Sequence, residues 1–346
     1  MIVEIDIERI AEGGEGVGRF ADGADAGLVC FVPFVAVGER VRVRVVERKK
    51  NYARADLLEV VRPSPDRVLP RCRHFADCGG CDFQHLSYEA QIAAKIALVR
   101  AALRSVGAPE IRVVPAPEAY GYRARVKLHV QGGAVGYLAR RSSRFVAISE
   151  CPVLKPSLAA QIANANNSRD GEVWISDKRE SGLFEQANPE MNKHLVRDAT
   201  SAVSASGSPT LELYAGSGNF TIPLALAGES GVAIERDARA AGLLASRLGP
   251  DAPFRVHASD VAVVLPELPA TFATVLLDPP RDGAKRIIPE LLRLHARRII
   301  YVSCDAPTLA RDLAALASAY RVTALTLYDF MPQTAHVELM AILERY

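Results

Sequence analysis

From about Pro209 onward the sequence alternates between strand-like and helix-like segments. Apolar runs that end near Leu213, Leu277 and Val302 are each followed by a longer stretch with helical spacing of apolar residues. Repeated strand–helix units bury their apolar faces by forming a parallel sheet that is covered by helices. The carboxyl-terminal half of the chain is therefore predicted to be a doubly wound α/β domain.

The last two apolar segments, 321–330 and 336–346, follow one another without a helix between them. They are typical of two adjacent strands that close the sheet. A doubly wound sheet that ends in such a pair is the pattern of the class I methyltransferase fold, which is Rossmann-like. We therefore expect that fold here.

A tight glycine turn connects the first strand of this domain to its first helix. Gly216 and Gly218 let the backbone approach a ligand, and Glu235 ends the next strand, where a carboxylate can accept both hydroxyls of a ribose. A dinucleotide-binding turn would need a third glycine where the chain has Ile222. The turn therefore favours S-adenosylmethionine, which has no phosphate. Asp260, after the following strand, is either a contact to the adenine amino group or a helix cap.

Three further polar residues lie at strand ends that are expected to meet at one edge of the sheet. Asp278 precedes two prolines in "LLDPPRDG", Cys304 ends the next strand, and Glu338 lies in "AHVEL". A thiolate that adds to carbon 6 of a pyrimidine makes carbon 5 nucleophilic toward a methyl group, and a base must then remove the carbon 5 proton. Cys304 is thus a candidate nucleophile, Glu338 a candidate base and Asp278 a group that polarises the acceptor. The alternatives are a plain loop at Asp278 and a structural salt bridge at Glu338.

The amino-terminal region has a different residue pattern. Residues 1–62 contain short strand-like segments separated by glycine-rich turns, which predict a small closed barrel of the oligonucleotide-binding kind. Prolines within 61–70 indicate a linker. Residues 38–54 carry seven basic residues against two acids, and residues 120–146 carry six against none. Each stripe alone is most simply a solvated face, but two together favour a polyanionic partner.

Four cysteines in the middle of the chain have a three-plus-one spacing. Cys72, Cys78 and Cys81 are followed by Cys151. Zinc prefers two close pairs, whereas this arrangement with its Gly-Gly turn suits an iron–sulfur cluster better. No apolar run is long enough to span a membrane and the first residues lack a signal sequence, so we expect a cytoplasmic protein with thiols or metal ligands instead of disulfides. Cys30, in an apolar stretch, is expected in a core.

The order of these motifs resembles that of the RNA uracil-5-methyltransferases, which make 5-methyluridine in transfer and ribosomal RNA. The shared stretches are an amino-terminal TRAM-type barrel, "CRHFADCGGCDFQHLSYEAQ", "CPVL", "FEQANPEMN", "LYAGSGNF", "LLDPPRDG", "YVSCD" and "HVE", and they cover nearly the whole chain. The resemblance implies that Cys304 is the nucleophile and Glu338 the proton acceptor. It also implies a [4Fe–4S] cluster on the four cysteines of the central region. The cofactor positions that it implies are Gln186, Tyr214, Asn219, Glu235, Asp260 and Asp278, beside the glycine turn at Gly216.

The chain departs from the family pattern in two places, and one of them is Ala124, where the family commonly has Asn. Asp305 and Ala306 follow the nucleophile where the family usually has Asn-Pro, and an acidic neighbour is expected to raise the pKa of the thiol. Two rival hypotheses remain. An RNA cytosine-5-methyltransferase would typically have a second cysteine near the "DPP" motif, and this chain has none there. A catalytically weak RNA-binding protein of the same fold is disfavoured by the intact Cys304, Asp278 and Glu338.

The sequence therefore predicts three parts. Residues 1–62 are expected to form an RNA-binding barrel, residues 63–190 a central α+β domain with the iron–sulfur cluster and RNA contacts, and residues 191–346 the S-adenosylmethionine-dependent methyltransferase domain. The expected reaction is methylation of carbon 5 of a specific uridine in 23S ribosomal RNA or, alternatively, in transfer RNA. Because the base must leave its stack, the uridine is expected in a loop or single strand. Neither a membrane nor an obligate protein partner is expected.

Overall fold

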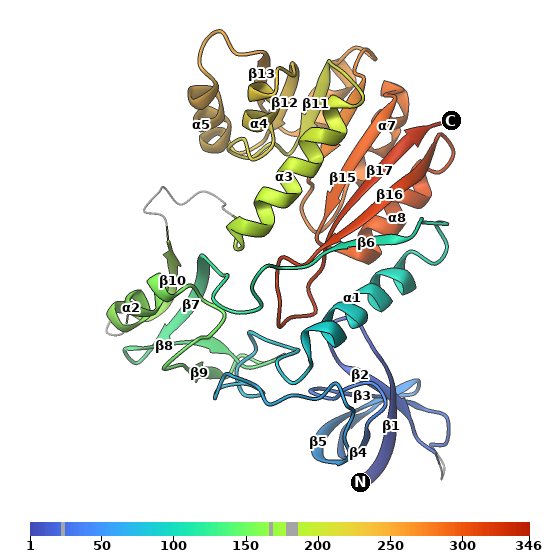
Figure 1. The fold of residues 1–346 in the computed structure, drawn as a ribbon, viewed down its shortest axis with the longest axis vertical. Helices are drawn as coiled ribbons and strands as arrows, with labels where there is room; N and C mark the ends of the chain where they lie inside the picture. The colour runs from blue at the N-terminus through green and yellow to red at the C-terminus, as the bar shows by residue number, and fades with distance from the viewer. Residues whose placement is uncertain (22–24, 166–168, 178–185) are drawn as a thin grey trace. The chain divides into compact units, whose positions relative to one another are not determined.

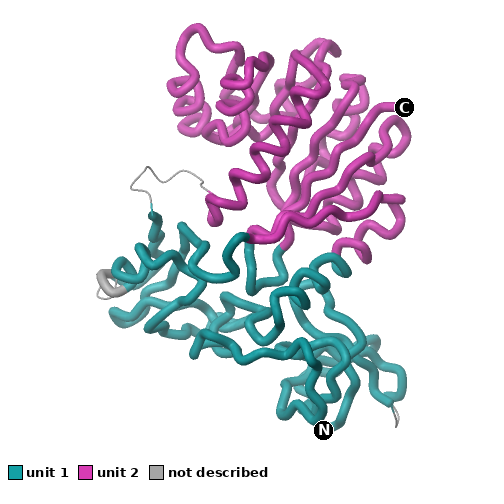
Figure 2. The backbone as a smooth tube through the Cα atoms, viewed as in Figure 1, with its two compact units in different colours: residues 1–98, 117–179, 331–336 teal, residues 99–116, 180–330, 337–346 magenta. Residues whose placement is uncertain are grey.

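The computed structural model describes residues 1–21, 25–165, 169–177 and 186–346. The chain forms two compact units, each assembled from non-contiguous segments (Figure 2). Unit 1 contains residues 1–98, 117–179 and 331–336, and unit 2 contains residues 99–116, 180–330 and 337–346. Within the described residues, no helix is long and apolar enough to cross a membrane.

The first part of unit 1 is a closed five-stranded barrel, which confirms the predicted architecture. Its strands follow the order β1-β2-β3-β5-β4. Inward-facing residues such as Ile5, Val41 and Val43 make the barrel core. Gly18 is required where β2 passes β1, because a Cβ atom there would come within 2.3 Å of the carbonyl oxygen of Asp6. The strands are β1 (Ile2–Ile10), β2 (Gly16–Arg19), β3 (Val29–Val32), β4 (Arg40–Arg48) and β5 (Tyr52–Arg62).

The proline-containing stretch after the barrel is not the free linker that the sequence indicates. Arg67 donates two hydrogen bonds, of 2.5 and 2.8 Å, to the fully buried carboxylate of Glu39 in the barrel. Burial alone would raise the pKa of Glu39, but the bonds from Arg67 and from the amide of Ala36 hold that pKa below its usual value. The stretch is therefore docked on the barrel by a buried ion pair.

Unit 1 also contains a four-stranded antiparallel sheet in the order β10-β7-β8-β9. Alternate residues of β7, such as Val126 and Leu128, are buried in a core that includes Leu158 of helix α2. The basic stripe at 120–146 includes the hairpin that β7 and β8 form. Strand β10 was not predicted, because it pairs with β7 across a long stretch of sequence. The elements are β7 (Arg125–Gln131), β8 (Ala134–Leu138), β9 (Phe145–Ala147), β10 (Gly171–Ser176) and α2 (Pro156–Ala165).

Residues 331–336, near the end of the chain, complete unit 1. Gln333 is buried and has a left-handed backbone with φ of 69°. It exchanges two hydrogen bonds with Gln91, and its carbonyl oxygen accepts from the amide of Asp82. The Asp82 carboxylate in turn accepts from the amide of Ala335 at 3.0 Å. This return segment is therefore held by helix α1 (Tyr88–Ala102) and by the cysteine loop.

Helix α1 begins after a serine cap and ends before a glycine turn. The Ser87 hydroxyl accepts from the amide of Ala90, as expected of a capping residue. Regular helix stops at Ala102, and turns occupy the residues up to Gly107, which has a φ of 65°.

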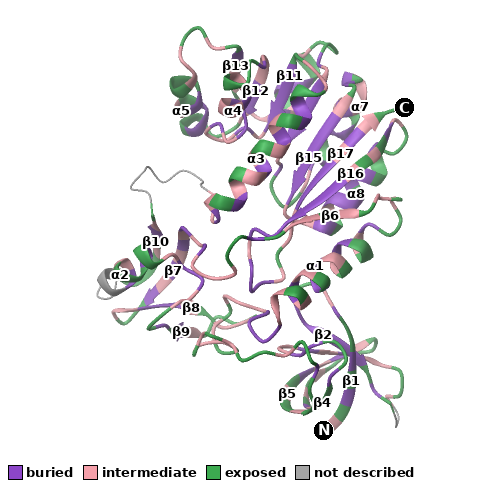
Figure 3. Cartoon of the chain, in the orientation of Figure 1, coloured by how far each residue is buried: buried purple, intermediate pink, exposed green. Residues whose placement is uncertain are grey.

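Unit 2 is a doubly wound sheet of eight strands, which confirms the predicted Rossmann-like fold. The strands follow the order β13-β12-β11-β14-β15-β17-β16-β6, and the central ones are buried (Figures 1 and 3). The strands are β6 (Ile111–Val114), β11 (Thr210–Leu213), β12 (Gly231–Glu235), β13 (Phe254–Ala258), β14 (Thr274–Leu277), β15 (Arg298–Ser303), β16 (Tyr320–Tyr328) and β17 (Glu338–Arg345). The helices are α3 (Pro189–Ser204), α4 (Thr221–Leu226), α5 (Ala238–Leu248), α6 (Val261–Val264), α7 (Ile288–Leu294) and α8 (Ala306–Leu316), with short 3₁₀ turns at Leu265–Glu267 and Lys285–Ile287.

The final hairpin and the edge strand show what local patterns predict and what they do not. Strands β16 and β17 pair antiparallel, as expected from two apolar segments without an intervening helix. Strand β6 joins β16 in parallel, with Ile111 opposite Leu325, and was not predicted. Its four residues come from a distant part of the chain, so nothing in their local pattern indicates their partner.

Candidate active site and cysteine pocket

Strand register brings the predicted nucleophile and the two predicted carboxyl groups to one edge of the unit 2 sheet. Strands β14 and β15 are parallel, with Leu277 opposite Tyr301, so Asp278 and Cys304 leave the sheet at the same edge. Strand β17 runs antiparallel to β15 with Ser303 opposite Leu339, which places Glu338 beside Cys304. Ligands bind at this edge of open α/β sheets.

An arginine that the sequence reasoning did not single out completes this group. Arg281 lies in the "DPPR" turn after β14, close enough to Cys304 to hydrogen-bond to its sulfur. Burial, followed by the charge of Glu338, raises the pKa of Cys304, and Arg281 opposes that rise. The signal was present in the quoted motif as a cation three residues after Asp278.

The two carboxyl groups at this edge favour their protonated forms. Burial raises the pKa of Asp278. Burial and then the charge of Asp278 raise the pKa of Glu338 well above its usual value, while Arg281 opposes the rise. Two carboxylates that share a poorly solvated site disfavour each other's ionisation. The edge therefore holds a thiol, a cation and two carboxyl groups of high proton affinity, a set that is suited to moving protons.

Asp305, the residue after the candidate nucleophile, has a structural role. The Asp305 carboxylate accepts from the amide of Thr308 at 2.8 Å and caps helix α8. The charges that act most strongly on Cys304 are those of Glu338, Arg281 and Asp278. The thiol pKa is thus raised as expected, but the leading causes are burial and Glu338 and not Asp305.

The glycine turn of unit 2 has a left-handed backbone and lies next to a fixed carboxylate. Gly216 and Gly218 both have positive φ angles, of 56° and 97°. The Glu235 carboxylate accepts from the amides of Gly216 at 2.8 Å and Asp237 at 2.7 Å, so it is fixed beside the turn. Tyr214 also has a positive φ, of 63°, immediately before this turn.

The other predicted cofactor residues differ in the contacts that they make. Asp260 caps α6 by accepting from the amide of Ala262 at 2.9 Å, so the helix-cap alternative holds. Burial and then the charge of Asp260 raise the pKa of Tyr214 to about 12, which shows that these two side chains are close. Asn219 exchanges side-chain hydrogen bonds with Asn192 of α3. Gln186 is partly buried just before α3.

A second residue that the sequence reasoning missed is Glu212 in the middle of β11. It is buried, and one carboxylate oxygen accepts from the Thr221 hydroxyl at 2.7 Å. The other oxygen has no hydrogen-bond partner among the described residues. Burial raises the pKa of Glu212 to about 8, and the charge of Asp278 adds to the rise. A lone acid inside an otherwise apolar strand was the signal in the sequence.

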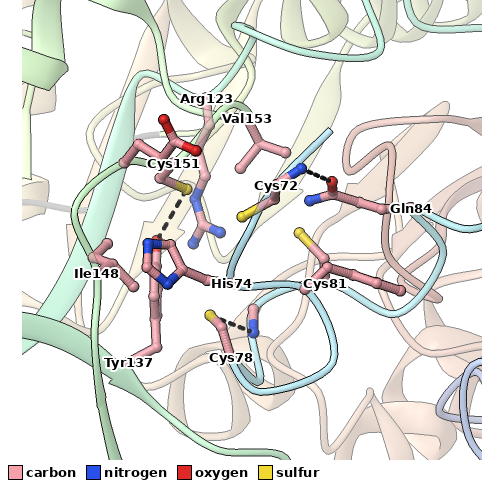
Figure 4. A pocket seen from close by; sticks show the side chains of 13 residues that line it. Cys72, His74, Cys78, Cys81, Gln84, Arg123, Tyr137, Ile148, Cys151 and Val153 are labelled. Carbon is pink, nitrogen blue, oxygen red and sulfur yellow. Dashed lines mark hydrogen bonds between the residues drawn. The ribbon is translucent and has the colours of Figure 1, made fainter. Parts of the chain in front are cut away.

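The four central cysteines line one pocket in unit 1. Figure 4 shows Cys72, Cys78, Cys81 and Cys151 around a common space, together with Tyr137 and Arg123. The amide of Gly80 donates to Cys78 Sγ at 3.4 Å. Gly79 is required beside it, because a Cβ atom there would come within 2.6 Å of the carbonyl oxygen of Leu138 in β8. The Gly-Gly turn thus lets the cysteine loop lie against the sheet.

Burial dominates the acid–base behaviour of the pocket thiols. It raises the pKa of Cys78 to about 11 and that of Cys81 to about 12, and the charges of neighbouring cysteines add to both rises. In the part of the chain that the structure describes, three or more cysteine, histidine or acidic side chains do not converge closely enough to hold a single metal ion. The four sulfurs therefore surround a space instead of meeting at a point.

The two basic stripes of the sequence are largely paired with acids in the structure. Arg40, Arg42, Arg44, Arg48 and Arg54 of the first stripe each form an ion pair within the barrel region. In the second stripe, Arg140 contacts Asp82 and Arg141 contacts Glu15. The stripes are therefore not continuous strips of unneutralised charge, which narrows the surface that is available to a polyanion.

Sequence profiles of two families match this chain. The family described as tRNA (Uracil-5-)-methyltransferase matches residues 167–237 and 266–346, which include the glycine turn, Asp278, Cys304 and Glu338. The family described as TRAM domain matches residues 2–58, which form the barrel.

Relatives extend the similarity to nearly the whole chain. The 23S rRNA (uracil(1939)-C(5))-methyltransferase RlmD of Alkalilimnicola ehrlichii is 30% identical over 99% of this chain and 96% of its own length. The enzyme of the same name from Halomonas elongata is 31% identical over 99% of this chain and 89% of its own length. The crystal structure of Pyrococcus abyssi tRNA (uracil-54, C5)-methyltransferase in complex with S-adenosyl-L-homocysteine has a TM-score of 0.75 and 25% identity, and the match covers 98% of this chain and 99% of that one. This chain therefore belongs to the RNA uracil-5-methyltransferase family and is an enzyme of that family.

Proposed function

We propose that this protein is a cytoplasmic enzyme that transfers a methyl group from S-adenosylmethionine to carbon 5 of a uridine in RNA, through a covalent adduct with Cys304. One observation supports this proposal most: Cys304 lies between a cation, Arg281, and a carboxyl group of high proton affinity, Glu338. A thiol that only packs in a core needs neither neighbour. The names of the relatives support RNA as substrate.

In the first step the Cys304 sulfur adds to carbon 6 of the uracil. A sulfur–carbon bond forms, and the electrons of the carbon 5–carbon 6 double bond move onto the carbon 4 carbonyl as an enolate. The thiol must first lose its proton to water. Arg281 favours this ionisation because it stabilises the thiolate against burial and the neighbouring carboxyl groups.

In the second step carbon 5 of the enolate attacks the electrophilic methyl group that S-adenosylmethionine supplies, and S-adenosylhomocysteine leaves. Glu338 then takes the proton from carbon 5, the sulfur–carbon bond breaks, and the double bond re-forms with Cys304 as thiolate. Glu338 acts as the base in its ionised form, and the raised pKa makes that carboxylate a stronger proton acceptor than an ordinary glutamate. Asp278 would contact the uracil, the cofactor or both.

The methyl donor would be held by the residues of the glycine turn. Glu235 would accept the ribose hydroxyls, since its carboxylate is already fixed by the amides of Gly216 and Asp237. The side chains of Gln186, Tyr214, Asn219 and Asp260 would contact the rest of the molecule. The absence of a third glycine at Ile222 agrees with a ligand that lacks a pyrophosphate.

We propose further that the four pocket cysteines hold a [4Fe–4S] cluster. The pocket is lined by four thiols that come from two segments of the chain, and an all-thiol donor set with three-plus-one spacing suits an iron–sulfur cluster. Because four cysteines leave no iron without a protein ligand, such a cluster would tie the cysteine loop to the end of β9 and serve a structural role.

The relatives favour 23S ribosomal RNA as the substrate, and transfer RNA is the second candidate. Two of the relatives are named for 23S ribosomal RNA, whereas the matching crystal structure is that of a transfer RNA enzyme. The barrel at residues 1–62 and the central region at 63–190 would contact RNA, and residues 191–346 would carry out the chemistry. The target uridine would lie in a loop or single strand, where flipping out a base is least costly.

A covalent trap tests the proposed function. Purified enzyme is incubated with S-adenosylmethionine and ribosomal or transfer RNA that contains 5-fluorouridine. Fluorine cannot leave as a cation, so a stable protein–RNA adduct should form, and mass spectrometry should locate it at Cys304. Parallel mapping of 5-methyluridine on unmodified RNA then identifies the RNA. An adduct at another residue, or methylation of cytosine, contradicts the proposal.

A further inference from the structure

Trp174, the only tryptophan of the chain, lies in an unusual place for a large apolar side chain. It stands on strand β10 directly opposite Lys127 of β7 and keeps 57% of its surface exposed. Its neighbour Ile175 points to the buried side of the same sheet. In the part of the chain that the structure describes, Tyr346 at the chain end is the only other exposed aromatic residue. The exposed indole leaves a flat aromatic face that a partner can contact.

The surroundings of this indole are cationic. The guanidinium carbon of Arg125 lies 4.3 Å from the ring centroid, and the Lys127 ammonium lies 5.9 Å from it. Both residues come from alternate positions of β7, so they share the outer face of the sheet with Trp174. One acid, Glu172, lies on the same face and forms an ion pair with Lys127 at 2.6 Å. The face thus combines one exposed aromatic plane with two cations.

We infer that Trp174 is a stacking platform for an unpaired base of the RNA substrate, with Arg125 and Lys127 beside it to contact the phosphates. Proteins that bind single-stranded RNA combine aromatic planes for the bases with cations along the backbone. This inference rests on the proposed function, which makes RNA the partner. It adds a substrate-binding residue outside unit 2, where the chemistry takes place.

The charges favour a nucleic acid over a protein as the occupant of this face. An arginine beside a tryptophan stacks on the indole, and guanidinium groups also bind phosphate oxygens. Arg125 and Lys127 beside the ring therefore suit a polyanion. A protein partner would cover the same ring, so the experiments below separate the two occupants by the use of RNA that lacks bases.

The single tryptophan makes the platform directly observable. The intrinsic fluorescence of the full chain is titrated with a single-stranded oligouridylate of about 12 nucleotides, a length within the usual range of such sites. The matched control is an abasic oligomer of the same length, which keeps the phosphates and lacks the bases. Oligouridylate should quench the emission of Trp174 at saturation, and the abasic oligomer should not. Equal quenching by both oligomers would overturn the inference, because it would show phosphate binding without stacking.

Two substitutions separate stacking from charge. Trp174→Ala should weaken oligouridylate binding roughly tenfold or more, and Trp174→Phe should restore most of the affinity because a ring remains. The salt dependence of binding should stay unchanged in both variants. Arg125→Gln should instead lower the slope of log affinity against log salt by about one, since one phosphate contact is lost. Leu69→Ala, which removes a residue with 93% of its surface exposed elsewhere in unit 1, is the matched control and should bind as wild type does.

Methyl transfer is measured in parallel, so failure of the inference is distinguishable from failure of the proposed function. If wild type methylates RNA and Trp174→Ala binds oligouridylate with unchanged affinity, the inference is wrong and the proposed function stands. If oligouridylate binding depends on Trp174 but no RNA is methylated at uridine, the platform stands and the proposed chemistry is wrong. Circular dichroism melting confirms that each variant is folded.

Discussion

Cys304 and the four pocket cysteines are all thiols whose pKa is raised by burial, yet their surroundings differ in kind. Arg281 and Glu338 come to Cys304 from separate turns and strands of unit 2. At the pocket cysteines burial is the leading cause, and the charge of Cys151 adds to the raised pKa of Cys72, Cys78 and Cys81. The pKa of Cys151 is also raised by burial, and the hydrogen bond with Tyr137 opposes the rise. The proposed nucleophile thus has a cation and a carboxyl group as its charged neighbours. The proposed cluster ligands have other thiols instead.

The largest effect should come from Cys304→Ala. Loss of a covalent nucleophile typically costs about three orders of magnitude in rate or more, and no other thiol stands at this edge of the sheet to replace it. Turnover is measured by the transfer of a radiolabelled methyl group to RNA. Binding of S-adenosylmethionine, measured by calorimetry, should be unchanged. Methylation within tenfold of wild type would show that Cys304 is not the nucleophile.

The next largest effect should come from Glu338→Gln. If Glu338 removes only the carbon 5 proton, the variant still adds the thiol and transfers the methyl group, but release slows by roughly 10²- to 10⁴-fold. A methylated protein–RNA adduct should then accumulate on ordinary RNA and be visible on a denaturing gel. The double variant Cys304→Ala with Glu338→Gln should give no adduct. Normal turnover without an adduct would show that a group other than Glu338 removes the carbon 5 proton.

A smaller effect, with a pH signature, should follow Arg281→Gln. Arg281 lowers the pKa of Cys304, so removing its charge raises that pKa and decreases the thiolate fraction at any pH below it. The rise of kcat/KM with pH should move to higher pH, with a loss of about tenfold at neutral pH that narrows in alkali. Lys285→Gln removes an exposed charge further along the same stretch and should leave the profile in place. An unshifted pH profile in Arg281→Gln would show that Arg281 does not influence the ionisation of Cys304.

The smallest effect on the chemical step should come from Cys81→Ser, which tests the proposed role of the pocket cysteines. Iron content per chain should fall and the melting temperature should drop by several degrees or more, because the energy of metal binding is part of the folding energy. At low temperature the folded fraction should still form the 5-fluorouridine adduct at Cys304. Cys30→Ala, at a buried thiol of the barrel core, should keep its iron. One zinc per chain and no iron in wild type would reverse the cluster assignment.

Local sequence patterns were enough to predict the fold of unit 2 and the sheet edge at which three candidate residues meet. They were insufficient for features that depend on distant pairing. The strand–helix alternation predicted the sheet of unit 2, and strand order alone placed Asp278, Cys304 and Glu338 at one edge. Strands β6 and β10 were missed because their partners lie far along the chain. Arg281 and Glu212 were missed because their importance comes from burial and from neighbouring charges, which no spacing rule conveys.

The basic stripes also show a limit of sequence patterns, because a pattern does not tell which charges are paired. The sequence counts charges, but only the fold shows that Arg140 and Arg141 are paired with acids while Arg125 lies over Trp174. Charge reversal at Arg140 would therefore disturb the contact with Asp82 and the cysteine loop, and not only RNA binding. The location of the acidic partners decides which cations remain for a polyanion.

The return of residues 331–336 into unit 1 means that no single cut in the chain separates the two units. Gln333 bonds to Gln91 and to the amide of Asp82, although Gln91 lies 242 residues away along the chain. The segments of unit 2 at 180–330 and 337–346 flank this return segment on both sides. A fragment that contains only residues 1–179 would therefore lack the contacts that Gln333 makes to helix α1 and the cysteine loop.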